Sequence, residues 1–232
     1  MAHSNLRIYI STQEGFPLST HRHQIAWDRV LEAAKINPFF DKKVKALEGD
    51  VEKKEMMLDY IWTGVSQLRG EVVNKACLMF SSVYSIPGSN HTSDEIKDIV
   101  KWLVDTGAFS NGGLDIEGRT YDKQQPFCHP VIKLLINNQW FGKKGEGVRF
   151  INAFQNMPIA LIALVVTALE CAIRSYSTGS KSSPDFTESA FRARWLFYHA
   201  KLQHLEEKSP KWMKKMQSEL FQAILWVTSI NV

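Results

Sequence analysis

Long hydrophobic segments are the first thing that this sequence of 232 residues lacks. Its most apolar run, Ile159–Leu169, has eleven residues, whereas a helix that spans a bilayer needs about 20. The first residues also lack the basic and then apolar order of a secretory signal. We therefore expect an intracellular protein, nuclear or cytoplasmic, that makes no contact with membranes.

Cysteine is scarce, and the three residues present form no CxxC pair: Cys77, Cys128 and Cys171. Cys77 and Cys171 lie on apolar faces of expected helices, where a free thiol acts as a small hydrophobic group. This favours a reducing compartment, so we interpret the sequon Asn90-His91-Thr92 as coincidental. No Cys/His cluster has the spacing of zinc ligands, and we expect neither a metal nor a cofactor.

Catalytic motifs are missing as well. The sequence contains no Gly-x-Ser-x-Gly elbow and no pair of acids in an apolar setting. Cys128 precedes His129 at an expected helix start, but side chains adjacent in sequence diverge in a helix. The simplest interpretation of His129 is a helix cap or a packing residue. The alternative is that Cys128, His129 and Trp140 line a ligand pocket. We expect no catalytic residue and favour a function other than catalysis.

The chain carries no strong excess of one charge, with 28 Lys and Arg against 24 Asp and Glu. Two local groups of basic residues stand out: Lys143, Lys144 and Arg149 in a glycine-rich loop, and Lys208, Lys211, Lys214 and Lys215 around Trp212. A face of this kind can hold phosphates and stack a base. The alternatives are a flexible connection for the loop and a solvated helix face anchored by an indole for the second group.

Helical periodicity is what the sequence does contain. Ile159–Leu169 follows Pro158 and is apolar on every helical face, so we expect a helix that is buried on all sides. Around it the pattern predicts an all-α fold of about eight helices in one domain, residues 20–232, preceded by an extended arm, residues 1–19. The stretch 112–121 is compatible with a short strand pair.

Caps and stops delimit these helices. We expect N-caps at Thr20 and Asp50, capping boxes at Thr92–Glu95 and Asp185–Glu188, and stops at Asn37-Pro38 and Pro87-Gly88. Further helices are expected from about Pro130 to Phe141 and after Ser209-Pro210. Two glycines, Gly64 and Gly70, lie inside the long helix, and we interpret both as places where a neighbouring helix comes close.

A resemblance to a known family is carried by Pro126-Phe-Cys-His-Pro-Val-Ile, Trp140-Phe141, and Pro158 with the apolar helix after it. Upstream it includes Ile61-Trp62, Leu68-Arg69-Gly70-Glu71, Lys75-Ala76 and Tyr84, and downstream Ser177-Thr-Gly, Phe186 and Tyr198-His199. Over about residues 50–228 the chain resembles an uncharacterised helical domain of basidiomycete-type fungi. The resemblance implies a helical fold and supplies no catalytic residues.

Three functions stay open, in this order. The first is a rigid helical module that binds a protein partner or forms a homodimer, favoured by seven tryptophans and the lack of a catalytic constellation. The second is a nuclear, chromatin- or mobile-element-associated domain that binds nucleic acid through the two basic groups. The third is an enzyme with a small-ligand pocket near His129.

Overall fold

The computed structural model describes residues 1–36, 39–86 and 91–230, which contain eleven α-helices, two short 3-10 helices (Ser19–His21 and Ala108–Ser110) and no β-strand. Their bounds are α1 Ala2–Thr12, α2 Arg22–Ile36, α3 Phe39–Glu48, α4 Val51–Tyr84, α5 Ser93–Thr106, α6 Pro130–Trp140, α7 Glu146–Arg149, α8 Ile151–Phe154, α9 Ile159–Arg174, α10 Glu188–Lys208 and α11 Pro210–Ile230. The all-α prediction is confirmed. Asn37-Pro38, Pro87-Gly88 and Asn90, invoked above as stops and as part of a sequon, lie outside the described residues.

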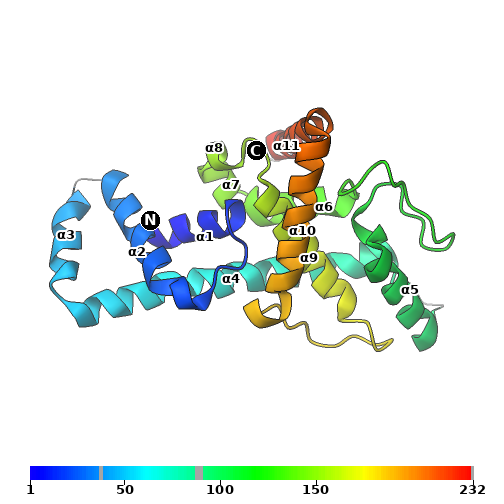
Figure 1. Cartoon of the computed structure of the whole chain (residues 1–232), viewed down its shortest axis with the longest axis horizontal. Helices are drawn as coiled ribbons and strands as arrows, with labels where there is room; N and C mark the ends of the chain where they lie inside the picture. The colour runs from blue at the N-terminus through cyan, green and yellow to red at the C-terminus, as the bar shows by residue number, and fades with distance from the viewer. Residues whose placement is uncertain (37–38, 87–90, 231–232) are drawn as a thin grey trace.

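Helix α4 forms the long axis of the molecule (Figure 1). Its 34 residues correspond to about 51 Å at 1.5 Å per residue. Helices α1, α2 and α3 pack on its first part, and α6 and α9 pack on it as well. Asp50 caps its start as expected, with a carboxylate oxygen 3.1 Å from the Lys53 N–H.

Helix α9 is the buried centre that the sequence predicted. Every residue from Ala160 to Ile173 is buried. Helices α4 and α10 make the most extensive contacts with it, and α1, α5 and α6 complete the cover. Because α9 is apolar on all faces, it is stable only when neighbours surround it, and this requirement organises the fold.

The N-terminal segment corrects one prediction, because α1 is a packed helix and not an extended arm. The alternation of Leu6, Ile8 and Ile10 suggested a strand, but Leu6 and Ile10 also lie four apart, on one helical face. Both side chains are fully buried, and α1 packs against α2 and α4. Tertiary contact therefore decides between the two periodicities.

Local signals at helix starts were partly right. The capping box Thr92–Glu95 is present with both of its hydrogen bonds. The box expected at Asp185–Glu188 is wrong, because Thr187 caps α10 and the Glu188 carboxylate instead accepts the N–H of Ser19 at 3.1 Å. In residues 112–121, where a short strand pair was considered, the structure has an isolated antiparallel bridge between Asp115 and Thr120.

The two glycines inside α4 have different surroundings. A Cβ built on Gly64 would lie 3.1 Å from His3 Nε2 of α1, as the close-approach interpretation requires. A Cβ built on Gly70 would meet nothing within 4 Å, so that interpretation is wrong at Gly70. The space beside Gly70 belongs to a surface groove that is described below.

We expect Gly70→Ala to raise the free energy of unfolding by about 1 kcal/mol, because alanine is the better helix former and fits without contact. Urea unfolding measures the change. Gly64→Ala serves as the comparison and should gain less, because its Cβ crowds His3. Equal gains for the two variants would contradict the assigned difference in space.

Candidate ligand-binding groove

A groove of about 800 Å³ lies between α4 and the segment that leads into α10. Residues on one face of α4 between Asp59 and Asn74 form its floor, and Ser183–Glu188 form the opposite wall. Fifteen helical steps separate Asp59 from Asn74, which corresponds to about 22 Å along the helix axis. The groove is therefore long compared with the side chains that line it.

Arg69 is the least expected residue of this groove. It is only 8 % exposed, and its buried Nε–H has no hydrogen-bond partner among the described residues. The guanidinium carbon lies 4.8 Å from the centre of the Phe16 ring, and Glu188 contributes a longer-range attraction. Burial lowers the pKa of Arg69 to about 10, so the group stays charged at neutral pH. A buried donor without an acceptor is costly. Nε itself is closed to solvent, so a ligand oxygen in the groove would bind the remaining N–H groups of the Arg69 guanidinium, which lines the groove.

Two hydroxyls and a glycine complete the floor. Thr63 Oγ1 donates to the carbonyl of Tyr60 at 2.7 Å, and Ser66 Oγ donates to the carbonyl of Thr63 at 3.1 Å. Since each hydroxyl hydrogen is used within α4, the free lone pairs of both oxygens can accept hydrogen bonds. Gly70 contributes no side chain, so another backbone could approach α4 closely there.

The charges at the edge of the groove are mixed. Arg22 pairs with Asp59 at 3.2 Å, and the wall contributes Asp185 and Glu188. Together with Arg69, the lining holds two guanidinium groups and three carboxylates. This balance favours an uncharged or basic ligand over an acidic one.

The structure does not bring together Cys128, His129 and Trp140, which the sequence analysis placed in one ligand pocket. His129 caps the start of α6 and Trp140 is its last residue, about 16 Å along the axis at 1.5 Å per residue. The Trp140 side chain is fully buried. Trp140 is therefore held apart from Cys128 and His129 by the length of α6.

His129 has the structural role that the sequence analysis considered simplest. Its Nδ1 accepts the Val131 N–H at 3.2 Å, and its ring stacks on Tyr84 with centres 5.1 Å apart. Burial lowers its pKa to about 4. Burial also raises the pKa of Cys128, whose thiol donates to the Pro126 carbonyl. A protonated thiol beside a weakly basic imidazole is the opposite of an activated nucleophile.

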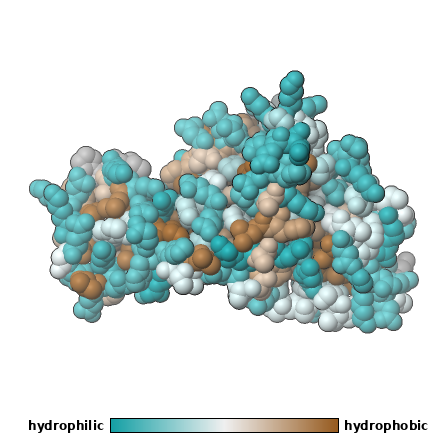
Figure 2. Space-filling view, viewed as in Figure 1, coloured by the Kyte–Doolittle hydropathy of each residue, from teal (hydrophilic) through white to brown (hydrophobic). Residues whose placement is uncertain are grey.

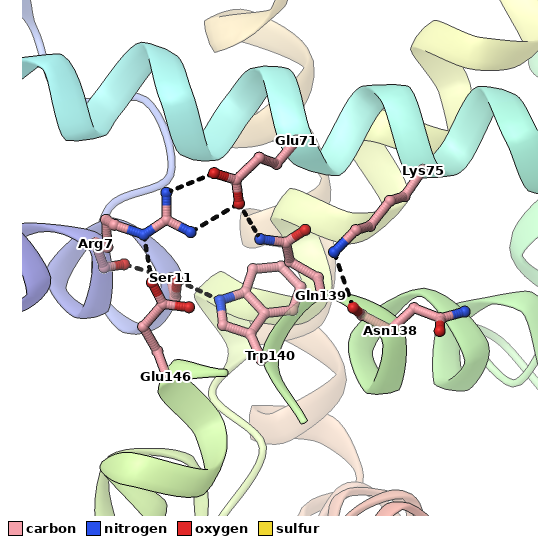
Figure 3. Close-up of polar contacts among 8 residues, drawn as sticks. All are labelled: Arg7, Ser11, Glu71, Lys75, Asn138, Gln139, Trp140 and Glu146. Atoms are coloured by element: carbon pink, nitrogen blue, oxygen red, sulfur yellow. Dashed lines mark hydrogen bonds and ion pairs between the residues drawn. The ribbon is translucent and has the colours of Figure 1, made fainter. Parts of the chain in front are cut away.

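Trp140 belongs to a polar network that joins α1, α4, α6 and α7 (Figure 3). The Arg7 guanidinium donates to both oxygens of Glu71, at 3.0 and 2.8 Å, and to the carboxylate of Glu146. The indole N–H of Trp140 donates to Ser11 Oγ at 2.8 Å. The contacts of Arg7, Glu71 and Trp140 are all made within the protein, so we assign the network to stability and not to ligand binding; among the described residues only Gln139 Oε1 of the drawn network is buried without a hydrogen-bond partner.

The predicted basic residues face different hollows. Arg149 lines a hollow with α1 and α2, whereas Lys214 lines another beside Gln155 and Asn156. All seven basic residues of these two groups are exposed: Lys143, Lys144, Arg149, Lys208, Lys211, Lys214 and Lys215. Trp212 is half-buried and packs against the core, as the anchoring indole of the alternative interpretation would. Nucleic-acid binding by these residues stays a prediction.

Glu170 is a buried polar residue that the sequence analysis missed. It is fully buried on α9, and its carboxylate accepts hydrogen bonds from Arg174 Nε at 2.6 Å, Arg194 Nε at 2.9 Å and the Tyr198 hydroxyl at 2.6 Å. The available signal was a carboxylate that directly follows the run Ile159–Leu169. Its three donors come from α9 and α10, so it locks those helices together.

In residues 1–36, 39–86 and 91–230, no helix combines the length and the hydrophobicity that a membrane-spanning segment requires. The same part of the chain shows no group of three or more His, Cys, Asp or Glu residues placed to hold a metal ion.

Comparison with known proteins gives one match. Residues 1–205 match a family model described as Domain of unknown function (DUF6532). The match thus begins and ends earlier in the chain than the extent of about 50–228 expected from the resemblance. No curated protein and no solved structure matches the chain.

Proposed function

Since the chain belongs to the DUF6532 family, whose description names no activity, we propose a function from its surface: a module that binds an extended segment of another protein in the groove along α4. The single observation that carries the proposal is the largely buried guanidinium of Arg69, which lines that groove and makes no hydrogen bond with the described residues. Such a donor is satisfied when a carbonyl oxygen of the bound segment reaches it.

The floor suits a polypeptide backbone because it offers both hydrogen-bonding roles. Arg69 donates, while the oxygens of Thr63 and Ser66 accept. An extended chain presents carbonyl and N–H groups in alternation and rises about 3.3 Å per residue. A floor of about 22 Å therefore matches six or seven residues, and Gly70 gives their backbone room.

A small molecule is a poorer match for the same groove. Sites for small ligands usually enclose most of the ligand surface, whereas this groove is long and open along α4. The three carboxylates of the lining further disfavour acidic segments. We therefore expect a partner segment that is uncharged or basic. We also keep the fungal origin and the intracellular location, nuclear or cytoplasmic, as proposals from the sequence.

Selection from a random-peptide library tests the proposal. Peptides that bind the protein should be poor in Asp and Glu, and Gly70→Leu should weaken them at least about tenfold by filling the floor. Arg69→Met should weaken them by a similar factor, because the loss of a charged donor is worth about 1.5 kcal/mol or more. Fluorescence anisotropy with the selected peptides measures both effects.

Ser81→Leu is the matched control for the groove variant. It places the same side chain at an exposed position of α4 that does not line the groove, and peptide affinity should not change. Failure to enrich any peptide would contradict the proposal. So would peptides that bind Gly70→Leu and Ser81→Leu equally well.

A further inference from the structure

A second pocket, of about 470 Å³, lies between α10 and the loop that connects α5 with α6. Figure 1 shows α10 in front of α9, and Figure 2 shows hydrophobic surface over α10 and beside it. The pocket shares no lining residue with the groove along α4. Its volume falls within the range typical of small-ligand sites.

Aromatic rings form the walls of this pocket. Phe127 comes from the loop, and Phe197 and Tyr198 come from α10. Phe127 has φ = 57°, a left-handed backbone that is strained for a bulky residue. The ring is nevertheless held in place, 6.4 Å from that of Tyr198 and edge to face with it. Strain of this kind persists where the surrounding structure fixes a side chain in a required position.

Tyr198 is a rigid wall and not a reactive group. Its hydroxyl donates to Glu170 at 2.6 Å and accepts from Arg194 Nη2 at 3.1 Å. Burial, together with the charge of Glu170, raises the pKa of Tyr198 far above its ordinary value. The ring therefore faces the pocket with its polar end already satisfied.

Positive charge accompanies these rings. Lys201 Nζ lies 4.4 Å from the centre of the Phe197 ring, and both residues line the pocket together with His204. Among the described residues that line it, none is an aspartate or a glutamate. The groove along α4 carries three carboxylates, so the two hollows differ in the sign of charge they attract.

We infer that this pocket binds a small planar anion, an aromatic ring that carries a carboxylate. The ring packs between Phe127 and Phe197, and the carboxylate is paired by Lys201 with His204 beside it. Arg194 covers Phe197 as well, at 4.6 Å, but its charge is already paired with Glu170. Lys201 is thus the cation that the structure assigns to the ligand.

Titration calorimetry with naphthoate and its uncharged isostere naphthamide tests the inference on the whole chain. Naphthoate should bind at least about tenfold more tightly than naphthamide, because one charge-assisted contact separates them. Lys201→Met should reduce naphthoate affinity to that of the amide and leave amide affinity unchanged. Cyclohexanecarboxylate should bind more weakly than naphthoate, because it lacks a π face.

Two further measurements show whether a loss of affinity is specific to Lys201 and whether naphthoate binds in this pocket. Lys211→Met removes an exposed lysine of α11 that does not line the pocket, and it should bind naphthoate like the parent protein. Amide NMR shifts should change at Gly107 and Asn111, which line the pocket. The inference is overturned if acid and amide bind equally, if Lys201→Met and Lys211→Met behave alike, or if naphthoate does not bind at millimolar concentration.

Discussion

We expect His129→Asn to reduce the decrease in the free energy of unfolding that occurs as the pH falls from 6.5 to about 4. His129 is 9 % exposed, and burial lowers its pKa from 6.5 to about 4 in the folded protein. The unfolded chain therefore binds a proton in this window that the folded chain does not bind. Stability falls as the pH falls through it, by about 3 kcal/mol from this residue alone.

The direction of the effect follows from the neutral imidazole. Above pH 6.5 neither state protonates His129, so the residue contributes no pH dependence there. Below about pH 4 both states are protonated, and the loss is complete. Asparagine keeps the cap, because its side-chain oxygen can accept the Val131 N–H, but it does not titrate.

Urea unfolding from pH 7 to 4, followed by tryptophan fluorescence, measures the effect. The variant should be less stable at pH 7, because it loses the ring that stacks on Tyr84, and the gap should close as the pH falls. His21→Asn, at an exposed position, should leave the pH profile of the parent protein unchanged. Parallel profiles for His129→Asn and the parent protein would show that His129 is not kept neutral by the fold.

Glu170→Ala is expected to lower the free energy of unfolding by about 2–4 kcal/mol. The substitution removes the acceptor of the buried Tyr198 hydroxyl and of two arginines. Losing one partner of a fully buried ion pair costs about 3–5 kcal/mol. The loss expected for Glu170→Ala is smaller than this because the side chains of Arg174 and Arg194 are 46 % and 31 % exposed and can be hydrated.

Chemical denaturation at neutral pH measures this loss. Glu170→Gln keeps an acceptor of the same shape and should lose less than Glu170→Ala. Glu219→Ala is the control: this carboxylate of α11 is exposed and lies 3.7 Å from Lys215, so its removal should change stability by less than about 1 kcal/mol. Similar losses for Glu170→Ala and Glu219→Ala would contradict the central role of Glu170.

Several features of the fold could be predicted because they depend only on residues that are close together in the sequence. The buried helix after Pro158 was recognisable because a helix that is apolar on every face is stable only when other elements cover all of its faces. The caps at Asp50 and Thr92 were recognisable because a cap joins a side chain to an amide three residues away. Signals of this range need no knowledge of the rest of the chain.

The candidate sites could not be predicted, because their residues come from distant parts of the chain. Arg69 lies in a long helix among many charged residues, and in the folded chain it is buried beside Phe16, a residue far away in the sequence. The sequence pattern predicts Gly70 to be a packing glycine, whereas the structure has open space beside it. Whether a charged side chain is available to a ligand depends on how deeply it is buried and on how many hydrogen-bond partners it has. Neither property can be recognised from the neighbouring residues in the sequence.

By itself, the sequence determined that the chain is helical, where several of the helices begin and which helix lies at the centre, since periodicity and capping act over one or two turns. Only the tertiary structure decided that residues 2–12 are a helix, that Glu170 joins α9 to α10, and that Arg69 is left without an acceptor. Those outcomes depend on which surfaces meet, and contact between distant segments is what turns an ordinary polar residue into a buried one.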